Sequence, residues 1–140
     1  MRSRADLYDW ELLHLHGRVD QDVGFYRALA LAVGGPVLEL ACGTGRVARR
    51  LPGLVVGLDV DHGMLASARR RGVACVVQAD MRRFALGGSG GFGLIAIPYN
   101  SLQLLLDPAD AVSCLRCAAS HLRPGGLIAF EATDFAAARD

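Results

Sequence analysis

The sequence contains no lysine: all 15 basic residues are arginine, and 14 acidic residues balance them to a formal net charge of +1. A chain that binds nucleic acid over a large surface normally carries a clear excess of positive charge. We therefore expect no nucleic acid partner. The densest basic run, at 69–71, falls at the expected end of a helix, where cations interact favourably with the helix dipole.

Long apolar runs and paired cysteines are lacking as well. No segment approaches the ~20 consecutive apolar residues of a membrane span, and no apolar stretch with a small-residue cleavage site follows the N-terminus. We therefore expect a cytoplasmic chain without a membrane segment. Four scattered cysteines are too few for a disulfide scaffold. Cys114 and Cys117 have metal-like spacing but no second Cys or His pair to complete it, so we expect no metal site.

The residues that are present alternate in the manner of one α/β domain. A chain of 140 residues has the size of one ordinary domain. After a lead-in or lid at 1–20, apolar runs typical of buried strands alternate with helical patterns over 21–140. The predicted helices lie at 22–33, 46–51, 62–71 and 108–122, and the predicted strands at 37–40, 54–58, 73–77, 92–97 and 127–131. This alternation predicts an α/β fold with a doubly wound, mostly parallel sheet.

Residues suited to ligand binding follow the predicted strands. In open parallel sheets, ligands bind beyond the carboxyl ends of the strands. A glycine-rich turn at 41–45 follows the first strand, and its small residues let backbone N–H groups approach a ligand. Asp59 ends the second strand and can accept hydrogen bonds from both hydroxyls of a ribose. Asp80 follows the third strand and can accept one from an adenine amino group, and a polar segment at 98–101 follows the fourth.

The glycine-rich turn alone leaves two interpretations open. Gly43, Gly45 and Ala48 also match the dinucleotide pattern G-x-G-x-x-G/A, so an NAD(P)-dependent oxidoreductase is one alternative. The segments VLELACGTGR, VVGLDVDHGML, VVQADMRRF and LRPGGLIAFEA, taken together and in this order, resemble the motifs of class I (Rossmann-like) S-adenosylmethionine-dependent methyltransferases. The segments at 8–30 and 97–106 are similar to the bacterial small-molecule branch of that family.

The resemblance implies a site for S-adenosylmethionine, with a role for each residue that matches. Glu39 and the glycine-rich turn would hold the methionine end, Asp59 the ribose, and Asp80 the adenine amino group, while His62 or Met64 would flank the adenine. An aspartate after a strand can instead serve only as a helix N-cap, and a methionine is often only a core residue. The implied cofactor-binding residues are Glu39, Ala41, Gly43, Gly45, Asp59, Met64, Asp80 and Met81.

The resemblance also implies transfer of a methyl group to a small-molecule acceptor. Tyr99 and Asn100 would border the sulfonium and are the catalytic candidates, because they could orient the acceptor. His14 or His16 could act as a base from the lead-in. Well-oriented reactants recover roughly 7–11 kcal/mol of the barrier, so a dedicated base is not required. Besides the oxidoreductase, a module that binds the cofactor without turnover is an alternative.

The sequence departs from the family in three respects. The family commonly has glycine at the position of Ala41, and alanine takes a positive φ only at a cost. It commonly has an acidic residue at the position of Gly93. Full members continue beyond the fifth strand, so this sheet would lack the last strands and leave the strand at 127–131 on an open edge. We therefore expect a fragment of a longer protein, or a homodimer that covers this edge.

Overall fold

The computed structural model describes residues 3–15, 20–88, 90–134 and 136. Its helices are α1 (Arg4–Leu15), α2 (Gln21–Val33), α3 (His62–Arg70) and α4 (Pro108–Ser120), with the short 3-10 helices η1 (Ala48–Arg50) and η2 (Ser101–Leu104). Its strands are β1 (Val37–Leu40), β2 (Val55–Asp59), β3 (Cys75–Gln78), β4 (Phe92–Ile97) and β5 (Leu122–Phe130). None of these described helices has the length and apolar character needed to cross a membrane.

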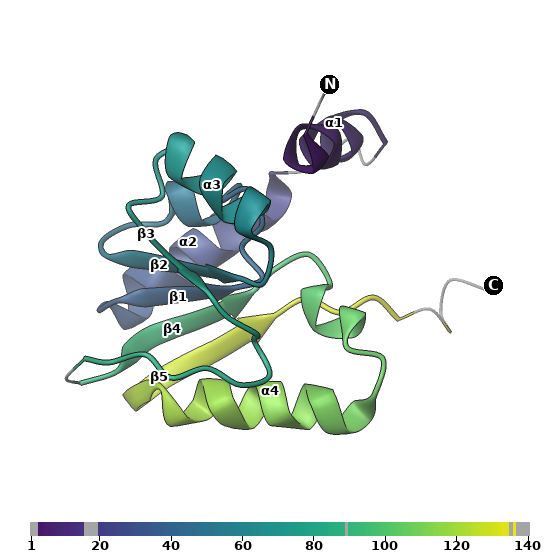
Figure 1. Ribbon diagram of the computed structural model, residues 1–140. Coiled ribbons are helices and arrows are strands. Elements are labelled where there is room, and N and C mark those ends of the chain that lie inside the picture. Colours follow the sequence, from purple (N-terminus) through teal and green to yellow (C-terminus); the bar gives the residue numbers. More distant parts are fainter. Residues whose placement is uncertain (1–2, 16–19, 89, 135, 137–140) are drawn as a thin grey trace.

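The five strands form one parallel sheet in the order β3-β2-β1-β4-β5 (Figure 1). Strand β1 lies at the centre, where all of its side chains are buried, and it pairs with β2 on one side and β4 on the other. Apolar residues on both faces of a strand suit this position, because helices cover both faces of a parallel sheet. The predicted doubly wound α/β fold is confirmed.

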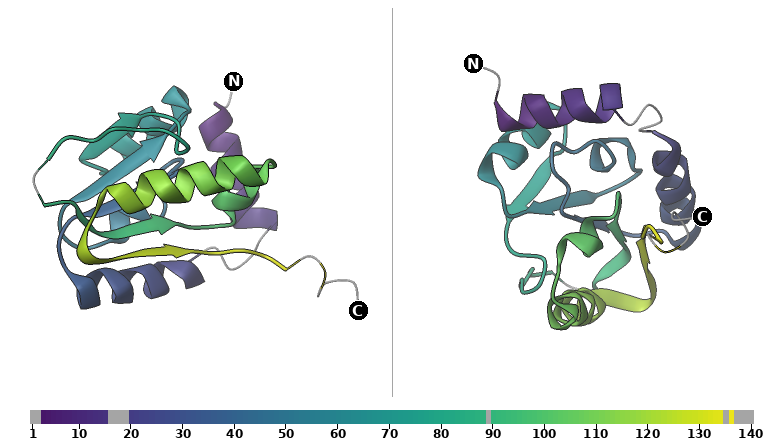
Figure 2. Two further views of the ribbon diagram at one scale, coloured as in Figure 1. Left: turned by 90° about the horizontal axis from the view of Figure 1, so that it is seen from below. Right: turned by 90° about the vertical axis from the view of Figure 1, so that its right-hand side faces the viewer.

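Helices α2, α3 and α4 lie in two layers on either side of the sheet (Figure 2). On one face, α2 packs Val23, Tyr26 and Ala30 against β1 and β4, and α3 completes the same layer. On the other face, α4 packs Cys114 and Ala118 against a cluster of leucine and isoleucine side chains from β1, β2 and β4. Apolar side chains thus fill both interfaces, and the carboxyl ends of the strands are left at one edge of this sandwich.

Two predicted elements differ from the structure near the glycine-rich turn and the third strand. The prediction of an α-helix at 46–51 was wrong, because this segment forms only the short 3-10 helix η1. Gly45 has a φ of 80°, and Pro52 follows two residues after η1, so too few residues remain for an α-helix. The third strand begins at Cys75, two residues later than predicted, since Val73 instead packs against Ala68 of α3.

The lead-in segment contains a helix that the sequence pattern did not predict. Ser3 and Asp6 cap its start reciprocally, because the Ser3 hydroxyl accepts from the Asp6 N–H at 3.1 Å and the Asp6 carboxylate accepts from the Ser3 N–H at 3.0 Å. Asp9 fixes α1 to the rest of the fold by accepting a hydrogen bond from the Thr44 hydroxyl at 2.7 Å and forming an ion pair with Arg71. Polar contacts therefore hold α1 in place.

Strand β5 begins earlier than predicted and contains an irregularity. Its register against β4 moves from Phe92 opposite Leu122 to Leu94 opposite Leu127, so the residues between form a bulge rather than a separate turn. As expected, β5 is an edge strand of the described sheet. Leu127 and Phe130 on it are 42% and 46% exposed.

The structure explains the glycine at position 93. A Cβ atom there would lie 1.9 Å from the carbonyl oxygen of Gly34, so no larger residue fits. The Gly93 N–H donates to the carbonyl of Pro36 at 2.8 Å, and the Arg123 guanidinium donates to the carbonyl of Val33, at the end of α2. An arginine from β5 and close backbone contact therefore join α2 to the sheet at this point.

Candidate functional site

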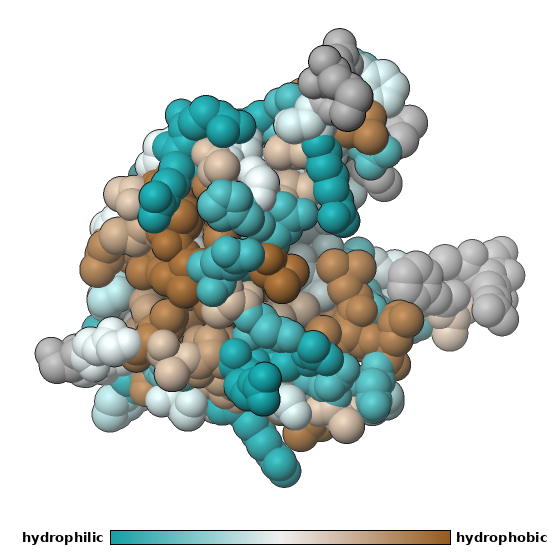
Figure 3. Space-filling model, in the orientation of Figure 1, coloured by the Kyte–Doolittle hydropathy of each residue, from teal (hydrophilic) through white to brown (hydrophobic). Residues whose placement is uncertain are grey.

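A cavity of about 690 Å³ opens at the carboxyl ends of the strands, where the strand order reverses between β1 and β4. This volume and position are typical of ligand sites in open α/β sheets. Figure 3 shows the hollow between α1 and the segment around η2, with apolar side chains on the rim. Its lining residues are Arg4, Leu7, Tyr8, Glu11, Ala41, Gly43, Leu58, Asp59, Val60, Asp61, Met64, Ala79, Asp80, Met81, Arg82, Ser101, Leu104 and Leu105.

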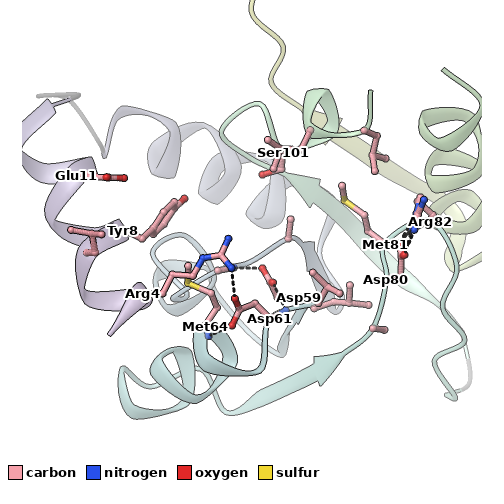
Figure 4. Close-up of a pocket in the computed structure, with 18 residues that line it drawn as sticks. Arg4, Tyr8, Glu11, Asp59, Asp61, Met64, Asp80, Met81, Arg82 and Ser101 are labelled. Carbon is pink, nitrogen blue, oxygen red and sulfur yellow. Dashed lines mark hydrogen bonds and ion pairs between the residues drawn. The ribbon is translucent and has the colours of Figure 1, made fainter. Parts of the chain in front are cut away.

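The cavity brings together most of the predicted cofactor-binding residues, although they come from the turn after β1, the end of β2, helix α3 and the segment after β3 (Figure 4). Those that line it are Ala41, Gly43, Asp59, Met64, Asp80 and Met81. Glu39 lines a smaller neighbouring cavity together with Ala41 and Tyr99. Gly45 lines neither cavity: a Cβ there would lie 2.6 Å from the Val73 side chain, so its glycine is explained by packing.

The turn after β1 bends sharply because several of its residues are left-handed. The φ angles of Ala41, Gly43 and Gly45 are 54°, 55° and 80°. For an L-residue, this conformation costs roughly 1–2 kcal/mol, so the predicted cost at Ala41 is present in the structure. The bend places the Gly43 N–H against the carboxylate of Asp59, to which it donates at 2.8 Å.

Asp59 is held rigidly at the end of β2. One carboxylate oxygen accepts from the Gly43 N–H, and the other accepts from the Asp61 N–H at 2.9 Å. A carboxylate has about four lone-pair sites, so further acceptor capacity remains toward the cavity. Asp61 in turn caps α3 by accepting from the Met64 N–H at 3.1 Å. The N-cap is therefore Asp61, which leaves Asp59 available for a ligand.

The opposite wall of the cavity carries Asp80, Met81 and Arg82. The Arg82 guanidinium donates to both oxygens of Asp80, with its shortest contact at 2.7 Å. These hydrogen bonds and that of the Arg82 N–H lower the pKa of Asp80 to about 2. Met64 is buried and faces the cavity, whereas His62 is exposed and does not line it.

Glu39 is a buried carboxyl group beneath the turn. It is 3% exposed, and burial raises its pKa to about 8, against the opposing effects of Arg46 and the Ala48 N–H. One of its oxygens lacks a hydrogen-bond partner among the described residues. Arg46 forms a two-pronged ion pair with Asp22 of α2, at 2.7 and 2.6 Å, and its guanidinium lies 5.7 Å from the ring centre of Tyr99.

Tyr99 and Asn100 form a left-handed turn after β4, with φ angles of 58° and 57°. The Tyr99 N–H donates to the carboxylate of Glu131 at 2.5 Å, and the Asn100 side chain donates to the Thr133 hydroxyl at 2.8 Å. Tyr99 lines the smaller cavity, while Asn100 lines neither. The turn is thus held from behind by the segment that follows β5.

Helix α1 supplies a wall of the cavity that the sequence analysis did not identify. Arg4, Tyr8 and Glu11 line it, and Figure 4 shows Tyr8 and Glu11 extending from α1 toward the open space. The sequence signal for this wall was the similarity of the segment at 8–30 to the small-molecule branch of the family, but that similarity pointed to no individual residue of α1. His14 stacks on Trp10 with ring centres 4.6 Å apart and does not line the cavity. His16 lies outside the described residues.

No group of His, Cys, Asp or Glu within the described ranges could hold a metal ion. Cys114 is buried in α4, and Cys117 instead exchanges hydrogen bonds with the backbone of Phe84 at 3.3 Å. The cavity offers carboxylates, such as those of Asp59 and Asp80, and apolar side chains, such as those of Met64 and Met81. These hydrogen-bond acceptors and apolar surfaces suit a nucleoside whose diol and amino group donate.

Comparison with known proteins agrees with this geometry. A family model described as a methyltransferase domain matches residues 37–126. A dTDP-3-amino-3,6-dideoxy-alpha-D-glucopyranose N,N-dimethyltransferase of Streptomyces fradiae is 36% identical over 99 residues, covering 68% of this chain and 38% of that protein. The crystal structure of DesVI from Streptomyces venezuelae superposes with a TM-score of 0.82 at 25% identity, over 96% of this chain and 59% of that one.

A further solved structure is similar to almost all of the chain. S-adenosylmethionine-bound CalS10, an amino pentose methyltransferase from Micromonospora echinaspora, has a TM-score of 0.72 at 25% identity, over 96% of this chain and 58% of that one. The chain thus spans between 38% and 59% of the length of these three proteins. The family match covers most of the sheet and every strand-end loop of the cavity, and the chain belongs to the methyltransferase domain family.

Proposed function

We propose that this chain binds S-adenosylmethionine and forms the cofactor-binding part of a methyltransferase. The observation that carries the proposal is the convergence of Asp59, Asp80 and the turn after β1 on one cavity at the reversal of strand order. Asp59 keeps acceptor capacity for a ribose diol, and Asp80 presents a charged carboxylate to an amino group. Met64 and Met81 provide apolar contact for the base between them.

The methionine end of the cofactor would lie toward the smaller cavity. Glu39 has an oxygen without a partner there, and a buried unpaired acceptor favours a ligand that brings a donor, such as an ammonium group. A positive ligand group would also favour ionisation of Glu39, whose pKa burial has raised. Asn100 and Gly45, which line neither cavity, would act through the shape of their turns.

We propose a small-molecule acceptor, of the amine-bearing sugar kind. Two similar proteins support this class of acceptor: one methylates an amino sugar nucleotide, and the other is an amino pentose methyltransferase. When bound, the cofactor supplies an electrophilic methyl group on a sulfonium. The chain's own residues align the acceptor and exclude water: Tyr99 borders the turn end of the site, and Tyr8 and Glu11 approach from α1.

Calorimetric titration with S-adenosylmethionine and, separately, with NADH tests the proposal. We expect saturable binding of S-adenosylmethionine alone, and at least a tenfold weaker affinity in Asp59→Asn, because a charge-assisted hydrogen bond contributes about 1.5–3 kcal/mol. Asp20→Asn is the matched control, since Asp20 is exposed, forms an ion pair with Arg50 and does not line the cavity. Binding of NADH instead would favour an oxidoreductase, and binding of neither would refute the proposal.

The methyl transfer itself needs a separate test. We expect methylated product from at least one member of a panel of amino sugar nucleotides, detected by mass spectrometry. Cofactor binding without any product across the panel would favour a binding module without turnover.

We also propose that a second copy of this chain covers the edge strand β5. The exposed backbone edge, together with Leu127 and Phe130, favours pairing with another strand. Light scattering coupled to gel filtration should give the mass of a dimer, and Leu127→Lys should shift it to a monomer. A wild-type monomer would exclude this pairing.

A further inference from the structure

Arg82 connects the cavity to helix α4. Its guanidinium forms ion pairs with Asp80, at 2.7 Å, and with Asp110, at 3.0 Å. Asp80 lines the cavity, whereas Asp110 does not. One planar side chain therefore spans from the wall of the ligand site to the first turn of α4.

The Asp80 carboxylate depends on Arg82 for all of its described hydrogen bonds. One oxygen accepts from the Arg82 backbone N–H at 2.9 Å and from Nε at 3.1 Å, and the other accepts from Nε at 3.1 Å and Nη2 at 2.7 Å. A carboxylate offers about four lone-pair sites, so the arginine occupies most of them. The direction left for a ligand donor is therefore set by the plane of the guanidinium.

Asp110 in turn limits how that plane can rotate. Its Oδ2 accepts from Nη1, on the side of the guanidinium that Asp80 does not use. A guanidinium is rigid and planar, so contacts at both ends restrict it more than either contact alone. Asp110 is itself well placed, because an acidic residue is favoured in the first turn of a helix.

We propose that Asp110 and Arg82 are positioning residues that direct the carboxylate of Asp80 toward the amino group of the cofactor's adenine. This inference rests on the proposed function, in which Asp80 accepts that hydrogen bond. It gives α4, on the opposite side of the sheet from α2, a role in recognition of the base (Figure 1). We call the chain of contacts from Asp110 through Arg82 to Asp80 the relay. It affects the selectivity for a ligand with an adenine amino group rather than ligand affinity in general.

The test compares two ligands that differ only at the base. S-adenosylhomocysteine carries the adenine amino group, and S-inosylhomocysteine has a carbonyl oxygen there, which an aspartate carboxylate repels. We measure both dissociation constants by calorimetry for the wild-type chain, Arg82→Gln, Asp110→Asn and the double variant. Arg116→Gln is the matched control for Arg82, since Arg116 is an exposed arginine of α4 that does not line the cavity.

Asp107→Asn is the matched control for Asp110. Asp107 caps the same helix by accepting from the Ala109 N–H at 2.9 Å but does not contact Arg82. The Asp107→Asn variant therefore distinguishes an effect on the stability of α4 from an effect on the contacts of Arg82. The thermal unfolding of every variant is measured in parallel. Arg82→Lys keeps the charge without the planar geometry, so its ligand ratio should fall between those of the wild-type chain and Arg82→Gln.

We expect the wild-type chain to prefer the adenosyl ligand. The preference should fall about tenfold in Arg82→Gln and about two- to fivefold in Asp110→Asn, the latter matching the value of an exposed ion pair. Because the two residues act in series, Asp110→Asn should add nothing in the Arg82→Gln background. Both controls should keep the wild-type ratio.

Equal loss of affinity for both ligands, an additive double variant or a wild-type chain without preference would overturn the relay. Failure of the wild-type chain to bind either ligand would overturn the proposed function and the relay with it. Binding with an unchanged ratio in Arg82→Gln would overturn the relay alone and leave the proposed function standing.

Discussion

The left-handed alanine at position 41 gives a prediction whose sign is unusual. Replacing alanine by glycine normally destabilises a protein, because glycine loses more backbone entropy on folding. At Ala41, however, the φ of 54° costs an L-residue roughly 1–2 kcal/mol, which Ala41→Gly would remove. The added entropy of glycine in the unfolded chain offsets about 0.4–1 kcal/mol of this gain. We therefore expect a net stabilisation of about 0.5–1 kcal/mol.

For a domain of this size, such a gain raises the melting temperature by roughly 2–4 °C. Circular dichroism during heating measures it, with Ala66→Gly as the control. Ala66 lies inside α3 with ordinary helical geometry, so the same chemical change there should cost about 1 kcal/mol. A lower melting temperature for Ala41→Gly, comparable to that of Ala66→Gly, would refute the reasoning.

Three other changes test the site and its support. Burial raises the pKa of Glu39 from 4.5 to about 8 in the folded chain, so the folded chain holds this proton more tightly than the unfolded chain does. The resulting contribution to the free energy of unfolding is complete below about pH 4.5 and is lost as the pH rises through about 8. The melting temperature of Glu39→Gln should therefore fall less than that of the wild-type chain between about pH 5 and about pH 9. Gly93→Ala should lower the free energy of unfolding by at least 2–3 kcal/mol, roughly the upper range for overpacking, because the new Cβ atom would lie 1.9 Å from a carbonyl oxygen. Urea denaturation measures this loss, and Gly87→Ala, whose Cβ atom would have no neighbour within 4 Å, should leave the stability unchanged. Asp22→Asn should cost about 3 kcal/mol in the same assay, because it breaks the ion pair with Arg46, in which the two side chains are only 9% and 13% exposed; an unchanged midpoint would show that the pair does not stabilise the fold.

The strands and the ligand end of the sheet were predictable because their signals are local. Short, mostly apolar runs predicted β1 and β4, and the aspartates at strand ends were expected to converge because parallel strands end at one edge. The residues of the cavity wall in α1 were not predictable in this way. Among the side chains whose burial the structure describes, that helix buries little besides Ala5 and Leu12 and is held by polar contacts, so its apolar residues show no clear period.

Other differences arise where distant segments decide the local structure. The length of η1 depends on the left-handed Gly45, where the Val73 side chain, beyond the next strand, leaves no room for a Cβ atom. Gly93 stands where the family commonly has an acidic residue, and only the backbone of Gly34 shows why no side chain fits here. The contact of Arg82 with Asp110 likewise joins residues 28 apart, which no short motif reveals.

The contact of Arg123 with Val33 has a consequence for synthesis of the chain. The arginine that closes the end of α2 is separated from it by 90 residues. On a ribosome, α2 and the first strands emerge long before Arg123 is made, so the carbonyl of Val33 lacks this hydrogen bond until Arg123 has been translated. The first half of the domain must therefore wait for β5 before it reaches its final arrangement, and such non-local closure slows folding. Synonymous codon changes that delay translation between these points would lengthen the exposure of this region to chaperones and proteases.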